Sequence, residues 1–282
     1  SCHMFYQPQW GTLGAWSSIA NSDYYGFTFS ARQRYKNSLT MDFNYTYSKS
    51  MDDASGLMTA GVTGGSAFIL NPFRQRDNYA ISDFDSRHII NSNFVWQLPF
   101  GTGRKFLSYN KVADVLFGGW QFSGILRYNS GLPVSAPYDD ARWATNWNVQ
   151  SNATRTRDVK PCPTRGGAFF GCNATQAFQS FRNARPGETG ERNIFRNVGF
   201  FGFDSGLGKS FKMPYSEKHN LQFRWEVFNL FNYQPMGAFD GSRSGYGLPL
   251  DPATKNPPVN FSRYTGIQGE PRFMQFLLRY SF

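Results

Sequence analysis

Hydrophobic and polar residues alternate along the last twelve positions of the chain, Pro271 to Phe282. Successive side chains of a β-strand point to opposite faces, so this pattern predicts a strand with one apolar face and one polar face that carries Arg279. A strand of this length that ends on an aromatic residue is typical of a membrane-spanning β-sheet, although a soluble sandwich can also use one. The apolar positions are Met274, Phe276, Leu278, Tyr280 and Phe282.

The same alternation recurs at six earlier places and is cleanest between Leu39 and Ser48. We therefore predict seven antiparallel strands, each with an apolar and a polar face. Lys209 breaks the pattern because it falls on the apolar face of its strand; it would either extend to a membrane interface or mark a β-bulge. The six earlier strands are predicted at residues 24–35, 39–48, 87–98, 120–130, 198–211 and 220–231.

Short and long connections alternate strictly between these predicted strands. This asymmetry is typical of outer-membrane barrels, in which short turns face the periplasm and long loops face the outside. The pattern predicts a periplasmic C-terminus and extracellular long loops. The shorter connections are at 36–38, 99–116 and 212–219, and the long ones at about 50–86, 131–197 and 232–270.

Seven strands do not close a barrel by the usual rule, because single-chain bacterial barrels have an even number. An open sheet edge in lipid would leave backbone groups without partners, at a cost of several kcal/mol for each group. We therefore predict an all-β, antiparallel transmembrane barrel in which residues 1–282 form one C-terminal segment. Further strands would come from upstream polypeptide or from another chain.

Composition agrees with a barrel and excludes membrane-spanning helices. Aromatic residues make up 18% of the chain, which suits interfacial girdles. No run approaches the roughly 20 apolar residues of a transmembrane helix. The formal net charge is +10, yet no run of five or six basic residues occurs. This charge suits an anionic partner such as lipopolysaccharide, or is simply spread over loops and a wet interior, and no nucleic-acid partner is expected.

The cysteine pattern predicts one disulfide. Cys162 and Cys172 bracket a segment rich in glycine, and in an oxidising compartment they would close a surface loop. A zinc site would need further ligands nearby, and the sequence offers none. Cys2 is left without a predicted role.

Charged residues on the polar faces of the strands are candidates for an internal surface. They would either contact a ligand or form a solvated lining paired across neighbouring strands, with Glu226 beside Arg224 or Arg279. In the long loops, Trp143 and Trp147 would either capture a ligand or partner or pack within the loops. The internal candidates are Asp42, Arg127, Asp204, Arg224, Glu226 and Arg279.

The sequence predicts neither an enzyme nor a metal or cofactor site. Of the three histidines, His88 is predicted near the outside and His219 in a periplasmic turn, so these two cannot meet, and neither lies beside a nucleophile motif. Acidic pairs occur at 52–53, 83 and 85, and 139–140, but without the spacing of a calcium loop. Asp83 and Asp85 are expected to form salt bridges with Arg87 and His88 at the start of a strand.

Three longer motifs resemble TonB-dependent outer-membrane receptors, most closely their Oar-like group. They lie at Lys36–Asp53, at Ser82–His88 with the Gly-Gly-Trp-Gln-Phe-Ser-Gly run that begins at Gly118, and at Leu221–Asn232 before the terminal strand. The resemblance covers most of the chain from about Asn21, and is loose in the loops at 131–197 and 232–270.

The resemblance implies a 22-stranded barrel that encloses a plug and takes up a scarce or bulky ligand with energy relayed by TonB. Export is also associated with this group. The implied partners are outer-membrane lipid and lipopolysaccharide, the remaining strands and plug, TonB acting through the plug, and the barrel-assembly machinery, which reads a terminal aromatic strand. The given sequence contains neither a TonB box nor a plug. An alternative is a structural or adhesive barrel whose loops bind a partner without transport, and another is a split barrel completed by a second polypeptide.

Overall fold

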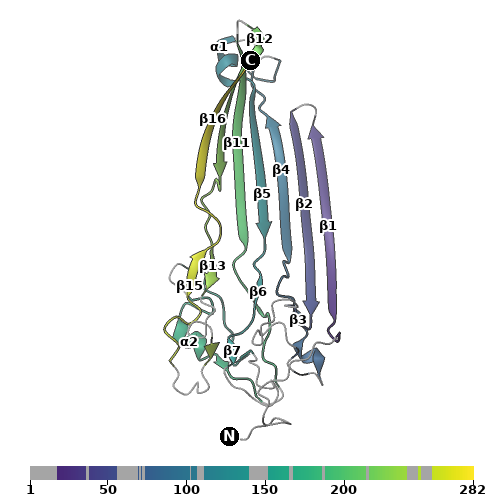
Figure 1. Cartoon of the computed structure of the whole chain (residues 1–282), viewed down its shortest axis with the longest axis vertical. Helices are drawn as coiled ribbons and strands as arrows, with labels where there is room; N and C mark the ends of the chain where they lie inside the picture. The colour runs from purple at the N-terminus through teal and green to yellow at the C-terminus, as the bar shows by residue number, and fades with distance from the viewer. Residues whose placement is uncertain are drawn as a thin grey trace.

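Seven long strands lie side by side in one antiparallel sheet of the computed structural model (Figure 1). The structure describes residues 18–35, 38–55, 69, 71, 74–101, 103–106, 111–139, 152–164, 168–185, 188–213, 216–239, 247–248 and 256–282. Each long strand overlaps one predicted range, so the strand prediction is confirmed. The strands are β1 (Ser22–Tyr35), β2 (Leu39–Asp52), β4 (His88–Gln97), β5 (Trp120–Asn129), β11 (Phe200–Met213), β12 (Ser216–Phe228) and β16 (Phe273–Ser281).

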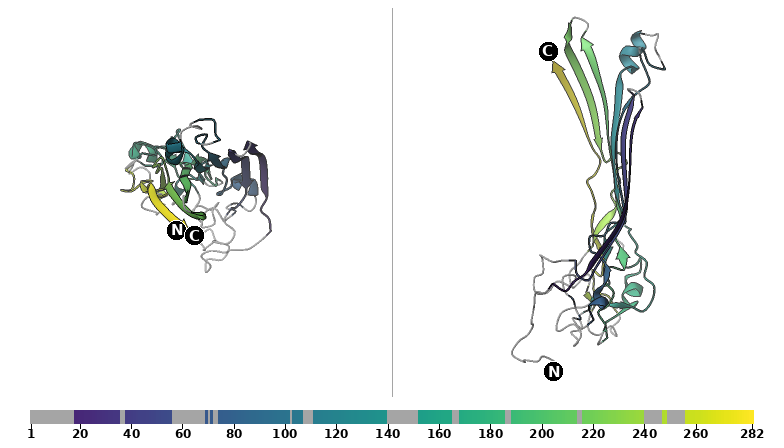
Figure 2. Two further views of the ribbon diagram at one scale, coloured as in Figure 1. Left: turned by 90° about the horizontal axis from the view of Figure 1, so that it is seen from above. Right: turned by 90° about the vertical axis from the view of Figure 1, so that its right-hand side faces the viewer.

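The sheet is a meander in which every long strand pairs with its neighbour in sequence. A two-residue strand, β3 (Ala80–Ile81), adds to the end of β2. Among the described residues β1 and β16 form the two edges, so the sheet is curved but open (Figure 2). The sequence expectation of an antiparallel all-β wall is confirmed, whereas a closed barrel is not formed by the described strands.

The register places the apolar positions of all seven strands on one face. One row of paired residues crosses the whole sheet, and every member of it is apolar or aromatic. The next row, one residue along each strand, points to the opposite face and is mostly polar. The apolar row is Tyr35, Leu39, Trp96, Phe122, Leu207, Trp225 and Phe276; the next row is Arg34, Thr40, Val95, Ser123, Gly206, Glu226 and Gln275.

Much of this apolar face is uncovered. Phe27, Phe276 and Leu278 are 61%, 68% and 69% exposed, and no second sheet packs against them within the described ranges. Exposed contiguous apolar surface on this scale marks a membrane or protein contact. A soluble sandwich would bury these rows between two layers, so that alternative does not describe this fold.

Short and long connections emerge at opposite ends of the strands (Figures 1 and 2). Two details differ from the sequence prediction. The hairpin between β11 and β12 is tighter than expected, and His219 lies within β12 rather than in a turn. The connection between β4 and β5 contains a helix, α1 (Lys111–Phe117), that the strand pattern did not indicate.

The long connections between β5 and β11 and between β12 and β16 fold together into a compact unit, called here the loop module. Its regular elements are short because each pairs only with another piece of loop. They are β6 (Pro133–Val134), β7 (Tyr138–Asp139), β8 (Thr154–Arg155), α2 (Ala174–Phe178), β9 (Phe181–Arg182), β10 (Phe195–Arg196), β13 (Met236–Phe239), β14 (Gly247–Leu248) and β15 (Tyr264–Ile267). A 3-10 turn, η2 (Gln75–Asn78), lies in the connection before β4.

The buried aromatic core of the chain lies in the loop module, not in the sheet. The Phe170 ring lies 5.2 Å from the rings of both Phe181 and Phe195, and 5.7 Å from that of Phe261, all measured between centroids. Phe169, Phe178 and Phe261 are at most 2% exposed. Neither described α-helix is long and apolar enough to cross a membrane.

Candidate functional site

The polar face of the sheet carries cross-strand ion pairs. Arg127 Nη2 donates to Asp204 Oδ2 at 2.7 Å, between β5 and β11. The other Asp204 oxygen accepts the backbone N–H of Asn229 at 2.8 Å, which ties the strand to the end of β12. Arg32 Nε donates to Asp42 Oδ1 at 2.5 Å between β1 and β2. The predicted internal charges therefore share one face and are largely paired along it.

Glu226 is the centre of a further cluster on the same face. Its two carboxylate oxygens accept from Arg224 and from Gln275 of the neighbouring strand β16. Of the two partners proposed from the sequence, the structure selects Arg224. Arg279 lies in register with Gln222 instead. These side chains are partly exposed, so the pairs contribute little to the stability of the sheet and mainly fix the positions of the charged groups on its polar face.

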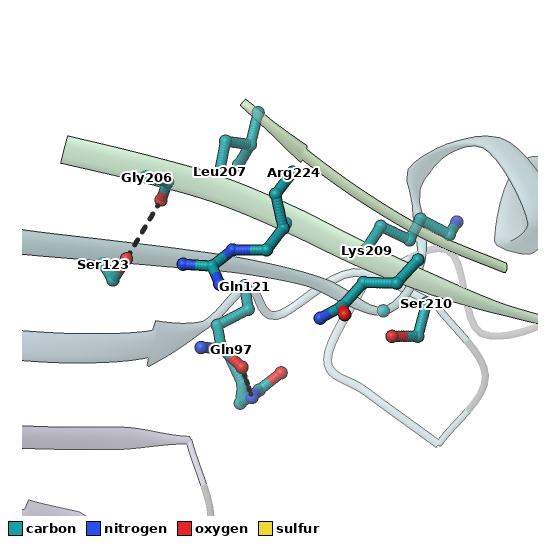
Figure 3. Close-up of a pocket in the computed structure, with 11 residues that line it drawn as sticks. Gln97, Gln121, Ser123, Gly206, Leu207, Lys209, Ser210 and Arg224 are labelled. Atoms are coloured by element: carbon teal, nitrogen blue, oxygen red, sulfur yellow. Dashed lines mark hydrogen bonds between the residues drawn. The ribbon is translucent and has the colours of Figure 1, made fainter. Parts of the chain in front are cut away.

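A polar groove of about 410 Å³ lies on this face near the short connections (Figure 3). Gln97 donates to Gln121 at 2.8 Å across β4 and β5, and the Ser123 hydroxyl donates to the Gly206 carbonyl at 3.3 Å. Glycine at 206 and 208 keeps the floor low, because no side chain rises from it. The lining is completed by Gly119, Leu207, Lys209, Ser210, Gln222 and Arg224.

The groove offers hydrogen-bonding groups. Its side chains are amides, hydroxyls and one guanidinium, which together bind polar backbone or hydroxylated groups. Within the described ranges no group of three His, Cys, Asp or Glu residues could hold a metal ion. The arrangement can accept and donate hydrogen bonds along the polar face of the sheet.

Lys209 does not belong to the polar surface, although its backbone borders the groove. Its side chain points toward α1 (Figure 3), and Nζ donates to the carbonyls of Asp114 at 3.2 Å and Val115 at 2.6 Å. The register continues through Lys209 without a bulge, and the irregularity comes later, at Lys212 and Met213. The bulge considered from the sequence is therefore wrong at this position. The apolar face holds a buried lysine because a helix end supplies its partners.

Three residues of the acidic pairs, Asp52, Asp83 and Asp85, are partners of distant arginines. Arg192 Nη2 donates to Asp52 Oδ1 at 2.5 Å and lies 3.6 Å from Asp83, while Arg196 pairs with Asp85. Asp52 and Arg192 are 5% and 7% exposed. The expected pairing of Asp83 and Asp85 with Arg87 and His88 is wrong, because the loop module brings its own arginines to the end of β2.

His88 and Asp53 have other partners. The Nδ1 atom of His88 lies 2.9 Å from the Tyr45 hydroxyl, across β2 and β4. One oxygen of Asp53 accepts the backbone N–H of Asn21 at 2.9 Å, which fixes the start of β1 against the end of β2. Both residues therefore serve the sheet, and neither lies in the groove.

The predicted disulfide between Cys162 and Cys172 is confirmed. Their Cα atoms lie 5.2 Å apart, and the bridge closes the segment that leads to Phe169 and Phe170 of the aromatic core. A bridge over so short a loop restricts the unfolded segment and holds these rings near their partners.

The loop module carries one carboxylate that links its stability to pH. Arg182 donates to both oxygens of Glu188, at 2.6 and 2.9 Å, and the backbone N–H of Arg185 donates at 2.8 Å. These bonds, that of the Arg182 side chain first, lower the pKa of Glu188 from 4.5 to about 2.

Acid should therefore loosen this part of the loop module. A depressed carboxylate pKa stabilises the fold fully above pH 4.5 and loses that contribution as the pH falls toward about 2. We expect proteolysis around Glu188 to accelerate over this interval, and the Glu188→Gln variant to lack that step. Equal pH profiles for the two proteins would contradict the assignment.

The terminal strand is an edge with an intact aromatic row. The Tyr280 hydroxyl lies 2.6 Å from Nδ1 of His219, and Phe282 is 92% exposed. Phe276 stacks on Trp225 of β12 with ring centroids 5.9 Å apart. The assembly-signal residues proposed from the sequence thus lie on one face, along an edge whose other side has no described strand.

Several sequence candidates fall outside the described residues, namely Trp143, Trp147, Cys2 and Asp140. Conversely, sequence reasoning missed Arg192, Arg196 and the phenylalanine core of the loop module. An available signal was the density of phenylalanine around the predicted disulfide, since a solvated loop rarely carries so many large apolar residues.

A one-layer sheet with an uncovered apolar face and an ion-paired polar face is the wall of a membrane β-barrel. A family model described as an outer membrane beta barrel domain matches residues 3–275, nearly the whole chain. The chain therefore belongs to the family of outer-membrane β-barrel domains, which supports an outer-membrane location. No curated protein and no solved structure matches it.

Proposed function

We propose that this chain forms the C-terminal wall of a TonB-dependent outer-membrane transporter. In this proposal the apolar face contacts lipid, the polar face lines the lumen, and further strands close the barrel, 22 in all by resemblance. The long-loop end faces the outside and the C-terminus faces the periplasm. The observation that carries the proposal is the polar groove on the face that would line the lumen. A groove of hydrogen-bonding side chains there suits a barrel that encloses a second polypeptide segment.

The groove suits a folded polypeptide such as a plug. Gln97, Gln121 and Gln222 present amide groups that can pair with exposed backbone, and Arg224 adds a donor for carboxylates or carbonyls. Its position near the short connections is where a plug driven from the periplasm would contact the wall. Movement of such a plug, not chemistry on the wall, would admit the ligand.

Filling the groove tests whether it is occupied. A Cβ atom at Gly208 would meet its nearest neighbours at 3.5 and 3.6 Å, so the strand itself accepts a side chain there. We expect Gly208→Trp in the full-length protein to lower the free energy of unfolding by about 1–3 kcal/mol, because the indole would overpack against a luminal segment.

The measurement is thermal or denaturant unfolding of the protein purified from outer membranes. Leu278→Trp is the matched control, since Leu278 is 69% exposed on the apolar face. If Gly208→Trp were as stable as this control, the groove would be an open, water-filled surface.

Binding to TonB, which would supply the energy, is the direct test of the transporter proposal. The purified full-length protein should bind the periplasmic domain of TonB, and binding should tighten when ligand-containing growth medium is added. Absence of any binding would overturn the transporter proposal while leaving family membership intact.

The loop module favours one alternative, an adhesive barrel whose external unit binds a partner without transport. Its aromatic core and disulfide give it a rigidity that open loops lack. An adhesive barrel predicts cell attachment that is unchanged by loss of TonB, whereas a transporter predicts uptake that stops without it.

A further inference from the structure

The helix α1 lies at the end of the sheet from which the short connections emerge (Figure 1). Lys209 and Trp120, whose side chains belong to the apolar face of the sheet, both reach the backbone of α1. Trp120 Nε1 donates to the Leu116 carbonyl at 2.9 Å, beside the two bonds from Lys209. Three successive carbonyls at the C-terminal end of α1 are therefore bonded to side chains of the strands.

This pattern suits surroundings that are poor in water. The last carbonyls of a helix lack their regular backbone partner, and in water they need none from the protein. Here the Asp114 carbonyl also accepts the backbone N–H of Gly118 at 2.9 Å, so the carbonyls of Val115 and Leu116 depend most on the side chains of the strands. In lipid each unpaired carbonyl would cost several kcal/mol. Lys209, which forms two of the bonds to these carbonyls, is only 6% exposed. Its neighbours on this face are apolar, namely Trp120, Leu207 and Phe223.

The last three residues of α1 are apolar and exposed. Val115, Leu116 and Phe117 are 61%, 59% and 57% exposed. Phe100 lies near Phe117, and its ring centroid is 5.9 Å from that of Phe106. An apolar groove of about 250 Å³ runs between Phe117 and the strands, and its other lining residues are Leu98, Phe100, Trp120 and Leu207.

Basic residues border this patch. Lys105 Nζ lies 5.4 Å from the centroid of the Phe106 ring, and Arg104 beside it is also exposed. Aromatic and aliphatic side chains next to lysine and arginine are the composition of segments that lie in a membrane interface. Cations at this level would meet lipid phosphates.

We propose that α1, with Phe100 and Phe106, is a membrane-interface anchor that inserts among the phospholipids of the leaflet at the short-connection end. The patch continues the apolar face that family membership assigns to hydrocarbon, so lipid, rather than a protein, is its occupant. The anchor would hold the rim of the barrel at a fixed depth. The inference depends on the barrel alone and holds whether or not the protein transports a ligand.

The test places a fluorescent label at position 116. The full-length protein carrying Cys2→Ser and Leu116→Cys is labelled with a small environment-sensitive dye and reconstituted into phosphatidylethanolamine–phosphatidylglycerol vesicles. Val259→Cys is the matched control, because Val259 is 95% exposed in the loop module. Quenching is compared between aqueous iodide and lipids that carry a nitroxide in the headgroup or at the start of the acyl chain.

We expect the label at 116 to be quenched by the nitroxide lipids and to be about threefold less sensitive to iodide than the label at 259, as for a segment buried at the headgroup boundary. Quenching by iodide equal to that at 259, with no effect of the nitroxide lipids, would place α1 in water and overturn the proposal. Protection from both quenchers would mean that protein covers the patch, which would overturn it as well.

Discussion

Deletion of Tyr280–Phe282 is expected to reduce the folded protein in the outer membrane by about tenfold or more, because unpaired backbone groups in lipid cost several kcal/mol each. The deletion removes the last two of the nine paired positions between β12 and β16, Leu221 with Tyr280 and Asn220 with Ser281. It also removes the ring of Phe282, which stacks near His219 with centroids 6.4 Å apart.

The effect on assembly should exceed the effect on stability. An unpaired strand edge joins a second sheet edge by strand addition, and we propose that the barrel-assembly machinery reads β16 in this way. The edge of β16 pairs with β12 on one side only among the described strands, so its other side is available for such pairing. The shortened strand would present neither the full edge nor its terminal aromatic ring.

The measurement is the amount of heat-modifiable, folded protein in outer-membrane fractions. Tyr280→Phe serves as the matched control, since it keeps the ring and removes the hydroxyl that lies beside His219. Normal outer-membrane levels of the deleted form would refute the role assigned to the terminal strand.

Arg192→Ala should lower the stability of the loop module by about 3–5 kcal/mol, the usual cost of leaving one member of a buried ion pair without its partner. Arg192 donates to the carbonyls of Asp52 at 2.9 Å and Asn78 at 3.2 Å, as well as to the Asp52 carboxylate. Without Arg192, the Asp52 carboxylate, which is 5% exposed, would be buried without its cationic partner.

Hydrogen exchange of residues 188–197 in the reconstituted protein would measure this loss. Arg32→Ala is the control, because Arg32 is 83% exposed in its pair with Asp42 and such surface pairs contribute about 0–1 kcal/mol. The double variant Arg192→Met, Asp52→Asn should lose less than Arg192→Ala, since it removes both charges of this buried pair. Equal exchange in Arg192→Ala and Arg32→Ala would show that the pair does not anchor the loop module.

The sheet was predictable from the sequence because the period of two is a local signal. The alternation of polar and apolar residues around Leu39 and Trp96 in sequence indicates which face of the sheet each side chain occupies. All seven strands follow from such alternation. The polar-face pairs of Asp42, Arg127 and Asp204 were predictable as a set for the same reason. Their partners follow from register, which the short turns fix.

The remaining features depend on contacts between distant segments. Arg192 lies 140 residues from Asp52 in sequence, so no local pattern indicates their pairing. Lys209 breaks the apolar pattern of its strand, and only the position of α1 explains this, because the helix supplies its hydrogen-bond partners. A helix of seven residues is too short for its hydrophobic period to be recognised in the sequence. The phenylalanines of the loop module resemble ligand-capturing loop residues in sequence, and only packing shows that they form a core.

The core of the loop module is assembled from two separate stretches of chain, with Phe170 in one and Phe261 in the other. Natural or engineered chimeras should therefore exchange both stretches together, because one stretch alone would have to pack against the unchanged core residues of the other. Antibodies raised against isolated peptides of this region should likewise fail to recognise the folded protein, since both stretches together form the loop module.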